Sequence, residues 1–536
     1  MTALPTASCQ HRHRHPREWQ QHDHIQYAVA EPIALGGCSG SSVTCTGALT
    51  ADDPRRIPSS SASPPTASKA SIIMANKRSK LSNGASSHWL SLEYSTGFNN
   101  HHSTEAVPGV LPTGQNSPQV VAHGLFAEQL SGTAFTCPRS TNKRSWLYRL
   151  SPSVRQGSYA PCASARSLNA AFTVVDPSPR RWSPMPLASR QDSVDFVDGL
   201  QTMCGAGDPS LKEGVAIHMY TCNAPMIDRA FCDADGECLI VPQLGVLHVT
   251  TELGRLRVAP GEILVVPRNI RFSVTPGAAA GDGSDDDLAC RGYMLEVFAS
   301  RGFVLPDLGP IGANGLAEPR DFMTPVAWYE DRACPGGFTI TTKYAGEVFD
   351  VSRDYSPYDV VAWHGNYAPY KYDLSCFHAV NSVTADHSDP SIFTVLTCPS
   401  QEPGVAVADF VIFPPRWLCA EHTFRPPYFH RNVMSEFMGL VGGTYDAKAG
   451  GEEGFAPSGA SLHVASTPHG PDAESYDAAV KADTSRPVKF AGGLAFMFET
   501  SAHLKLTAAA ASSGAAQPGY AKCWEALPRA HIAKGA

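Results

Sequence analysis

The segment Gly245-Val-Leu-His-Val-Thr-Thr-Glu-Leu-Gly254 and the two apolar runs after it decide the fold class. In this segment apolar and polar residues alternate, which indicates a β-strand with one buried face. Pro260-Gly261 turns the chain, and Glu262-Ile-Leu-Val-Val-Pro267 and Ile270-Arg-Phe-Ser-Val274 then read as two further strands. This order of strand, turn, strand, proline and strand predicts a small double-sheet jelly roll.

The second half of the chain repeats the strand-rich pattern. Ser391-Ile-Phe-Thr-Val-Leu-Thr397, Asp409-Phe-Val-Ile-Phe413 and Gly493-Leu-Ala-Phe-Met-Phe-Glu499 read as strands. Pro414-Pro415 and Pro426-Pro427 break the chain between the last two. We therefore predict a mostly β protein with two jelly-roll β-sandwich units that resemble cupins, the C-terminal unit carrying the metal site.

Length and composition suggest how the chain is divided. With 536 residues it can form two or three domains with large cores. Residues 1–90 are rich in Ser, Ala, Pro and Thr and lack strand or helix periodicity, so we expect a disordered extension. We assign residues 91–374 to an N-terminal cupin-like structural domain and residues 375–536 to a C-terminal cupin-like catalytic domain.

Charge and cysteine content bear on partners and location. The net charge of −8 argues against a nucleic-acid partner, which would require a basic surface. No run of eighteen apolar residues is present, so we expect no membrane span. The 15 cysteines contain no CxxC pair and predict reduced thiols. We expect a cytoplasmic protein; organelle targeting by the Ser-rich, basic extension is the less favoured alternative, because that extension also carries acidic residues.

A candidate metal site follows the second proline pair. Phe424-Arg-Pro-Pro-Tyr-Phe-His430 leads to Glu436, and Thr467-Pro-His469 comes later. Two imidazoles and one carboxylate are the ligand set of a non-haem Fe(II) centre with open positions. His430 and Glu436 are too far out of phase for one face of a helix, so we expect a strand and the turn after it. From spacing alone, two ordinary polar residues with an unrelated histidine remain an equal alternative.

The first jelly-roll unit lacks a comparable set. Arg271 stands where a cupin strand normally supplies a histidine, and His248 with Glu252 cannot close a metal site alone. We therefore predict a structural role for the first unit.

Long blocks of sequence resemble the homogentisate 1,2-dioxygenase family, from about Tyr94 to about Trp524. Besides the metal segment, the matching blocks are Leu130-Ser-Gly-Thr-Ala-Phe-Thr-Cys-Pro-Arg-Ser-Thr-Asn-Lys-Arg-Ser-Trp-Leu-Tyr148, Asp307-Leu-Gly-Pro-Ile-Gly-Ala-Asn-Gly315, Trp363-His-Gly-Asn-Tyr-Ala-Pro-Tyr-Lys-Tyr372, Asp389-Pro-Ser-Ile-Phe-Thr-Val-Leu396 and Asp409-Phe-Val-Ile-Phe-Pro-Pro-Arg-Trp417.

The resemblance implies a function and a role for each site residue. It implies that His430, Glu436 and His469 bind Fe(II), that His387 is the active-site base, and that Tyr445 and His469 contact the substrate. A histidine titrates near neutral pH and can take a phenolic proton. The implied reaction converts homogentisate and O2 to maleylacetoacetate, and the implied assembly is a homo-hexamer formed as a dimer of trimers.

Two other functions and several residues remain open. Another cupin ring-cleaving dioxygenase, such as one acting on gentisate, is the enzymatic alternative. A non-enzymatic bicupin for binding or storage is the other, although it would not require this ligand set. Lys143 and Arg144 could neutralise the substrate's acetate group or make a loop or intersubunit contact. For His364 and His463 a hydrogen-bonded structural role is favoured over a role at the metal.

Overall fold

The computed structural model describes residues 88–532 apart from 170, 278–287, 300, 308, 310–315, 381–382, 387–388 and 449–453. The described residues belong to the compact unit Ser79–Ala536. The predicted disordered extension and its targeting alternative fall on residues 1–87, outside the described part, and the short 3-10 turn η1 (His88–Leu90) lies at the end of the predicted range. No helix among the described residues is long and apolar enough to cross a bilayer.

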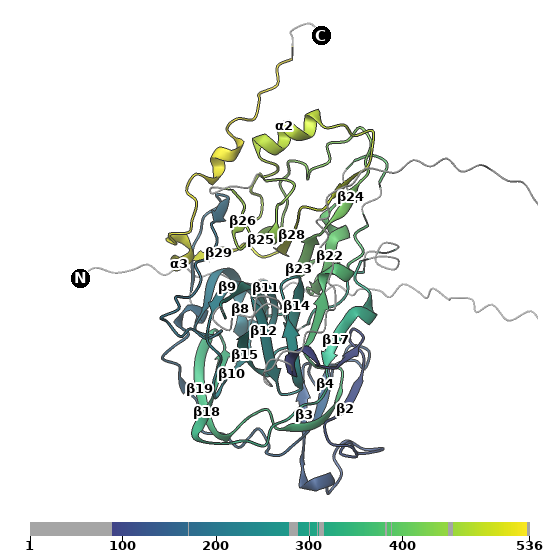
Figure 1. Cartoon of the computed structure of the whole chain (residues 1–536), viewed down its shortest axis with the longest axis vertical. Coiled ribbons are helices and arrows are strands. Elements are labelled where there is room, and N and C mark those ends of the chain that lie inside the picture. Colours follow the sequence, from purple (N-terminus) through teal and green to yellow (C-terminus); the bar gives the residue numbers. More distant parts are fainter. Residues whose placement is uncertain are drawn as a thin grey trace, which may run out of the picture. The chain divides into compact units, whose positions relative to one another are not determined.

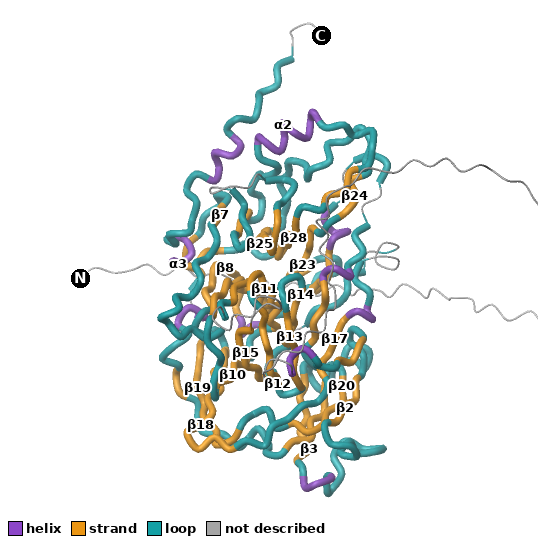
Figure 2. Tube along the Cα trace, viewed as in Figure 1, coloured by secondary structure: helices purple, strands orange, loops and turns teal. Residues whose placement is uncertain are grey.

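The described chain is mostly β, as predicted, and its strands form layered sheets (Figures 1 and 2). The largest sheet has ten strands, in the spatial order β1 (Tyr94–Thr96), β17 (Phe322–Pro325), β21 (Tyr370–Asp373), β14 (Glu262–Val266), β11 (Glu237–Leu244), β16 (Cys290–Val297), β9 (Glu213–Cys222), β8 (Leu200–Asp208), β29 (Lys505–Thr507) and β6 (Phe172–Val174). The next has seven, in the order β13 (Gly254–Val258), β12 (Val246–Thr251), β15 (Arg271–Gly277), β10 (Arg229–Asp233), β18 (Ala333–Tyr344), β19 (Glu347–Tyr355) and β5 (Ala160–Pro161).

The ten-stranded and seven-stranded sheets form the first jelly-roll unit. Ile240 and Leu264 of the ten-stranded sheet and Val249 and Phe272 of the seven-stranded sheet belong to one buried core. The strands read from Gly245–Gly254 and Ile270–Val274 lie in the seven-stranded sheet, whereas Glu262–Val266 is β14 of the ten-stranded sheet. The two faces of the sandwich therefore come from consecutive strands, as a jelly roll requires.

The second unit is built on a six-stranded sheet. Its strands are β22 (Thr394–Pro399), β23 (Ala406–Phe413), β28 (Gly493–Thr500), β25 (Ser435–Gly443), β26 (Ala460–His463) and β7 (Arg180–Trp182). Phe437 and Phe498 of this sheet share a second buried core with Leu239 and Ile263 of the ten-stranded sheet. The ten-stranded sheet is therefore the middle layer, with a core on each face.

This burial on both faces explains the sequence pattern of the middle strands. In β14, Ile263 and Val265 belong to the core shared with the six-stranded sheet, and Leu264 and Val266 belong to the core of the first unit. Successive side chains of a strand point to opposite faces, so a strand buried on both sides carries a continuous apolar run. The sequence shows such a run at 263–266, whereas β12, in an outer sheet, alternates.

Smaller elements complete the fold. A four-stranded sheet contains β2 (His102–Glu105), β20 (Val360–Gly365), β4 (Arg144–Arg149) and β3 (Phe126–Ser131), and β24 (Arg416–Leu418) pairs with β27 (Val488–Phe490). The described α-helices are α2 (Ala473–Lys481) and α3 (Ala508–Ala511). The remaining short 3-10 turns are η2 (Ala122–Gly124), η3 (Arg166–Asn169), η4 (Pro209–Leu211), η5 (Pro319–Asp321), η6 (Leu374–Cys376), η7 (Pro390–Phe393) and η8 (Tyr520–Trp524).

Two strands pair with sheets on the other side of the predicted domain boundary between residues 374 and 375. β7, from the N-terminal side, pairs with β26 of the six-stranded sheet. β29, from the C-terminal side, pairs with β8 and β6 of the ten-stranded sheet. The two units are thus tied together by strand exchange, and the boundary remains a prediction from sequence.

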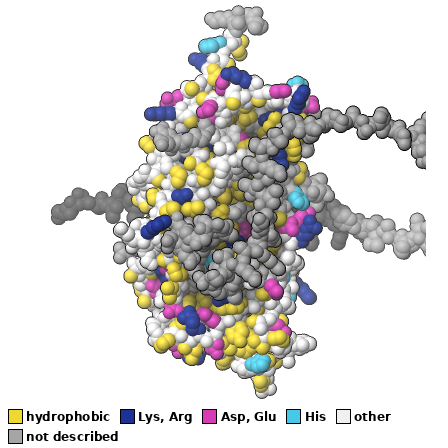
Figure 3. All heavy atoms as spheres, in the orientation of Figure 1, with side chains coloured by type: hydrophobic (Ala, Val, Ile, Leu, Met, Phe, Trp, Pro, Cys, Tyr) yellow, Lys and Arg dark blue, Asp and Glu magenta, His cyan; other side chains and the backbone are white. Residues whose placement is uncertain are grey.

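The described cysteines form no disulfide, and the visible face of the molecule carries charges of both signs. The cysteines of the described residues are free thiols, most of them buried. On the face drawn in Figure 3, Lys and Arg side chains are scattered among Asp and Glu side chains.

Candidate metal centre

The two predicted histidine ligands lie next to each other on paired loop segments. His430 and His469 form an isolated antiparallel bridge, with backbone N–H to O distances of 3.0 and 3.1 Å. Gly470 makes this close approach possible, because a Cβ at that position would lie 2.5 Å from the ring of Phe429. The two imidazole ring centres are consequently 4.2 Å apart.

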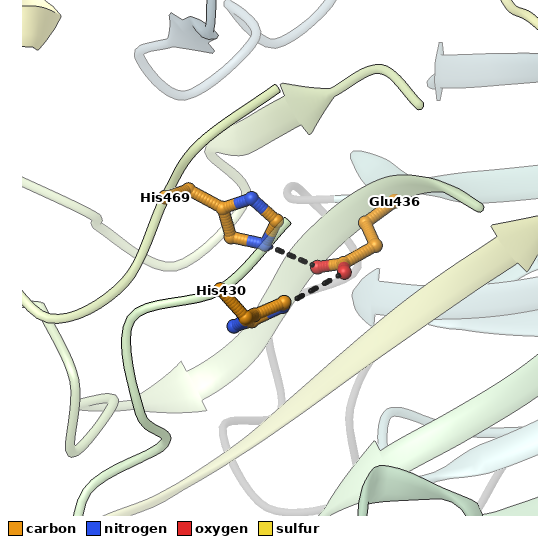
Figure 4. Close-up of side chains that lie close together, drawn as sticks. All are labelled: His430, Glu436 and His469. Atoms are coloured by element: carbon orange, nitrogen blue, oxygen red, sulfur yellow. Dashed lines mark hydrogen bonds and ion pairs between the residues drawn. The ribbon is translucent and has the colours of Figure 1, made fainter. Parts of the chain in front are cut away.

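Glu436 comes to these histidines from a strand. It is the second residue of β25, where Phe437 faces the core shared with the middle sheet and Glu436 therefore faces the opposite side. Its carboxylate lies 3.3 Å from Nε2 of His430 and 3.0 Å from Nε2 of His469 (Figure 4). The predicted order of a strand and then a turn was wrong: His430 lies in a loop, and Glu436 lies on the strand that follows it.

Backbone carbonyls fix the tautomers of both imidazoles. His430 Nδ1 lies 2.8 Å from the carbonyl of Tyr428, and His469 Nδ1 lies 2.9 Å from that of Thr467. A carbonyl only accepts, so each Nδ1 carries the proton and each neutral ring presents a lone pair at Nε2. Metal-binding histidines are typically oriented in this way by a bond from the second ring nitrogen.

The converging Nε2 and carboxylate atoms need a positive charge between them. Burial would raise the pKa of Glu436, but without a metal ion the hydrogen bonds that a protonated Nε2 of each imidazole donates hold it far below its usual range. Glu436 in turn raises the pKa of His430. Asn432 donates a further bond of 2.8 Å to the carboxylate. Two nitrogens and a carboxylate facing one point suit a divalent cation, so the residues fit the expected metal.

A second cluster of acidic residues lies in the first unit. In the described residues, two clusters of possible ligands have atoms within 4.8 Å of one another: His430, Glu436 and His469, and the fully buried Asp233, Asp235 and Glu296. Lys343 already occupies the second cluster, with Nζ 2.5 Å from Glu296 and 3.3 Å from Asp235. Glu252, the carboxylate considered in the first unit, instead pairs with Arg149 and Arg271.

The remaining predicted site residues are placed as follows. Tyr445 is buried, and its ring makes edge contacts with Phe413 and Phe455. Burial raises the pKa of its phenol well above the usual value, so the hydroxyl stays protonated. His387, the predicted base, lies outside the described residues. Asp389, two residues after His387 in the sequence, accepts a hydrogen bond of 2.7 Å from the hydroxyl of Tyr428.

The four residues with open roles separate into two groups. Lys143 and Arg144 lie at the start of β4 in the four-stranded sheet, where Lys143 contacts Asn99 at 2.5 Å. His364, in the same sheet, contacts His101 at 3.1 Å and Tyr148 at 3.4 Å. His463 is different, because its ring stacks on His469 with centres 4.2 Å apart.

Strand register adds site residues that sequence reading missed. Asp409 of β23 lies opposite Glu499 of β28, Glu499 opposite Glu436, and Glu436 opposite His463 of β26. Directly opposite residues share a face of the sheet, so these four form one polar row. Burial and the charge of Glu436 raise the pKa of Glu499 to about 8. The only signal in the sequence is that Asp409 and Glu499 are each the single acidic residue of an otherwise mostly apolar strand.

A layered jelly-roll protein with two histidines and a carboxylate at one point belongs to the class of cupin-like proteins with a candidate metal centre. Family models for homogentisate 1,2-dioxygenase match it, the N-terminal model at residues 93–374 and the C-terminal model at residues 375–531. The chain therefore belongs to the homogentisate 1,2-dioxygenase family, which makes it an oxidoreductase.

Individual relatives agree along most of their length. The homogentisate 1,2-dioxygenase of Homo sapiens is 54% identical over 444 residues, which cover 81% of this chain and 96% of that protein. The one of Arabidopsis thaliana is 51% identical over 449 residues, or 83% of this chain and 94% of that protein. A variant of Bacillus subtilis oxalate decarboxylase is 12% identical, covering 62% of this chain and 80% of that one at a TM-score of 0.26, too weak a likeness to carry an argument.

Proposed function

We propose that this chain binds Fe(II) through His430, Glu436 and His469 and cleaves the aromatic ring of homogentisate with O2 to give maleylacetoacetate. One observation carries the proposal: both imidazoles are held by backbone carbonyls with Nε2 facing the carboxylate of Glu436. Family membership supports the substrate, since the relatives are named for homogentisate.

Iron would supply the binding of O2 beside the substrate and the passage of electrons between them. The side chains of this chain do the rest. Glu436 and the two imidazoles leave one side of the site for substrate and O2. His387 is proposed to take the phenolic proton, and Tyr445, whose phenol stays protonated, to donate a hydrogen bond to the substrate.

We further propose the domain division at 374/375, a homo-hexamer formed as a dimer of trimers, and a cytoplasmic location. Each extends the family resemblance, and each has a direct measurement: limited proteolysis, light scattering and imaging of a fluorescent fusion.

Oxygen uptake with a pair of substrates tests the reaction. Metal-stripped protein would be loaded anaerobically with Fe(II), Zn(II) or no metal and then mixed with homogentisate or with gentisate in aerated buffer. We expect oxygen uptake only with Fe(II) and homogentisate, and one O2 consumed per ring opened. Uptake with gentisate alone would favour the other ring-cleaving enzyme, and Fe(II) binding without uptake on either substrate would favour a binding protein.

A further inference from the structure

A buried polar network lies directly behind the candidate metal centre. Lys448 donates to the hydroxyl of Tyr520 at 2.7 Å, and that hydroxyl lies 2.8 Å from Nε2 of His463. Lys448, His463 and Tyr520 are all at least nine-tenths buried, with exposed fractions of 6%, 1% and 2%. None of the three belongs to the predicted ligand set; a hydrogen-bonded structural role was favoured for His463 from sequence, and no role was predicted for Lys448 or Tyr520.

The direction of these hydrogen bonds follows from the donors available. Nζ of Lys448 donates to the Tyr520 hydroxyl, which leaves the proton of that hydroxyl free for His463. Nε2 of His463 therefore accepts, and the proton of that ring is on Nδ1. Among the described residues Nδ1 has no hydrogen-bond partner. The network fixes the tautomer and the plane of His463.

The orientation of His463 bears directly on His469. The two rings are stacked, with centres 4.2 Å apart and planes 4° from parallel. The ring of His463, oriented by its hydrogen bond with Tyr520, therefore packs against one face of the His469 ring. The backbone of His463 is itself held in strand β26, where His463 pairs with Glu436 of β25.

The same short turn also holds the chain that follows His469. Nε1 of Trp524 donates to the carbonyls of Gly470 at 3.4 Å and Pro471 at 3.2 Å. Tyr520 and Trp524 both belong to η8, and their rings contact each other with centres 5.2 Å apart. η8 therefore contacts His469 through its stacked neighbour and contacts the residues just after it through the backbone.

We propose that η8 is a brace that sets the position of His469, and that Tyr520 is a positioning residue for the metal. This inference rests on the proposed function. Burying the amine of Lys448 beside an imidazole is costly, and a purely structural turn would not require it. Among the described residues Lys448 has no carboxylate ion pair, and burial lowers its pKa to about 7. The guanidinium carbon of Arg181 lies over the ring of Tyr520, 4.3 Å from the ring centre.

The test compares two variants that each lose one buried tyrosine hydroxyl. Tyr520→Phe deletes the hydroxyl that bridges Lys448 and His463 and leaves the direct contact of 3.5 Å between Lys448 Nζ and His463 Nε2. Tyr293→Phe is the matched control, because the Tyr293 hydroxyl is also buried and donates to the carbonyl of Gly459 at 2.8 Å, away from the ligand loop. For each protein, the dissociation constant of Fe(II), the visible spectrum of the Co(II)-loaded form, the thermal midpoint and the kcat and KM for homogentisate would be measured.

We expect Tyr520→Phe to weaken Fe(II) binding by about 10- to 100-fold, the usual effect of losing a residue that orients a metal ligand. Its Co(II) spectrum should shift and its kcat fall while KM changes little. Tyr293→Phe should match the wild type in metal binding and spectrum. Trp524→Phe, which removes the donor to Gly470 and Pro471, should resemble Tyr520→Phe and serves if that variant does not fold.

Failure of the brace and failure of the proposed function give different results. If the wild type does not retain Fe(II), the metal assignment itself is wrong. If the wild type retains Fe(II) and both η8 variants keep the wild-type affinity and Co(II) spectrum, the brace is overturned. Equal weakening in Tyr293→Phe would also overturn it, because any lost buried hydroxyl would then have the same effect.

Discussion

The two jelly-roll units each bury a cluster of acidic groups, and they compensate the charge in different ways. In the first unit, Nζ of Lys343 lies among Asp235 and Glu296, so the protein supplies its own cation. In the second, no lysine or arginine of the described residues forms an ion pair with Glu436; its partners are His430 and His469. Lys343 thus compensates the negative charge of the first cluster, whereas the second cluster needs a proton or a metal ion.

The difference shows that acidic composition alone does not mark a metal site. Both units also hold a carboxyl group whose pKa rises to about 8: Asp233 in the first, through burial and Glu296, and Glu499 in the second, through burial and Glu436. What separates the units is which side chain faces the carboxylates. A buried ammonium group neutralises the carboxylates around it, and a pair of neutral imidazoles leaves a place for a cation.

The largest expected effect comes from removing the charge of the second cluster. Glu436→Ala should abolish both bound iron and turnover while the protein stays folded, because the core packing lies on the other face of β25. Elemental analysis and oxygen uptake on one preparation measure the two. If Glu436→Ala protein kept full iron content and turnover, the second cluster would not be a metal site, and the proposed difference between the two units would be wrong.

His387→Ala separates a proton-transfer role from metal binding in the second unit. Iron content should be retained, and turnover should fall by about 10²–10⁴, as is usual when a general base is lost. Iron occupancy and steady-state oxygen uptake would be measured together. Loss of iron would make His387 a ligand or its direct support, and the three-ligand site would be wrong.

Lys343→Met tests the first cluster. It leaves Asp235 and Glu296 buried without their cation, which typically costs about 3–5 kcal/mol of unfolding free energy. Iron per folded molecule should not change. Lys481→Met is the control, since its partner Asp477 is exposed and such a pair contributes about 0.3–0.5 kcal/mol. Denaturant titration gives both values, and a cost as small as that of the control would mean that Lys343 does not compensate the cluster.

Glu499→Gln tests the proton held beside the metal centre. In iron-free protein the folded state keeps this proton up to a pKa of about 8, whereas the unfolded chain releases it near 4.5. Between these values the folded state binds the extra proton, so the unfolding free energy of the wild type should fall as pH rises, by up to about 1.4 kcal/mol per pH unit. Glu499→Gln should lose the part of the slope that Glu499 contributes, while the part from Asp233 remains, and Glu402→Gln, at an exposed position, should keep the full slope.

The smallest effect is expected outside both units. Removing residues 1–73 should leave the thermal midpoint and oxygen uptake nearly unchanged, because the sequence there has no packing pattern to lose. Both quantities would be compared with those of the full chain. A large loss in either would mean that the extension contacts one of the units, and the comparison would then involve three regions.

Several features were predictable from local pattern. Asp409–Phe413 and Gly493–Glu499 fall within β23 and β28, as predicted. Ser391–Thr397 was predicted as one strand, but Pro390 starts the 3-10 turn η7 and the strand begins only at Thr394, because proline favours the first position of a helical turn. Local rules thus found the strands and missed where one of them begins.

The sequence by itself determined the family, the β character and the identity of His430, Glu436 and His469 as candidate ligands, because dense residue blocks and donor types are properties of the chain. Only the tertiary structure decided that one sheet serves two cores, that Glu499 lies beside Glu436, and that Tyr520 reaches His463. Those facts depend on strand register and on contacts between distant segments, and periodicity along a single strand contains no information about either.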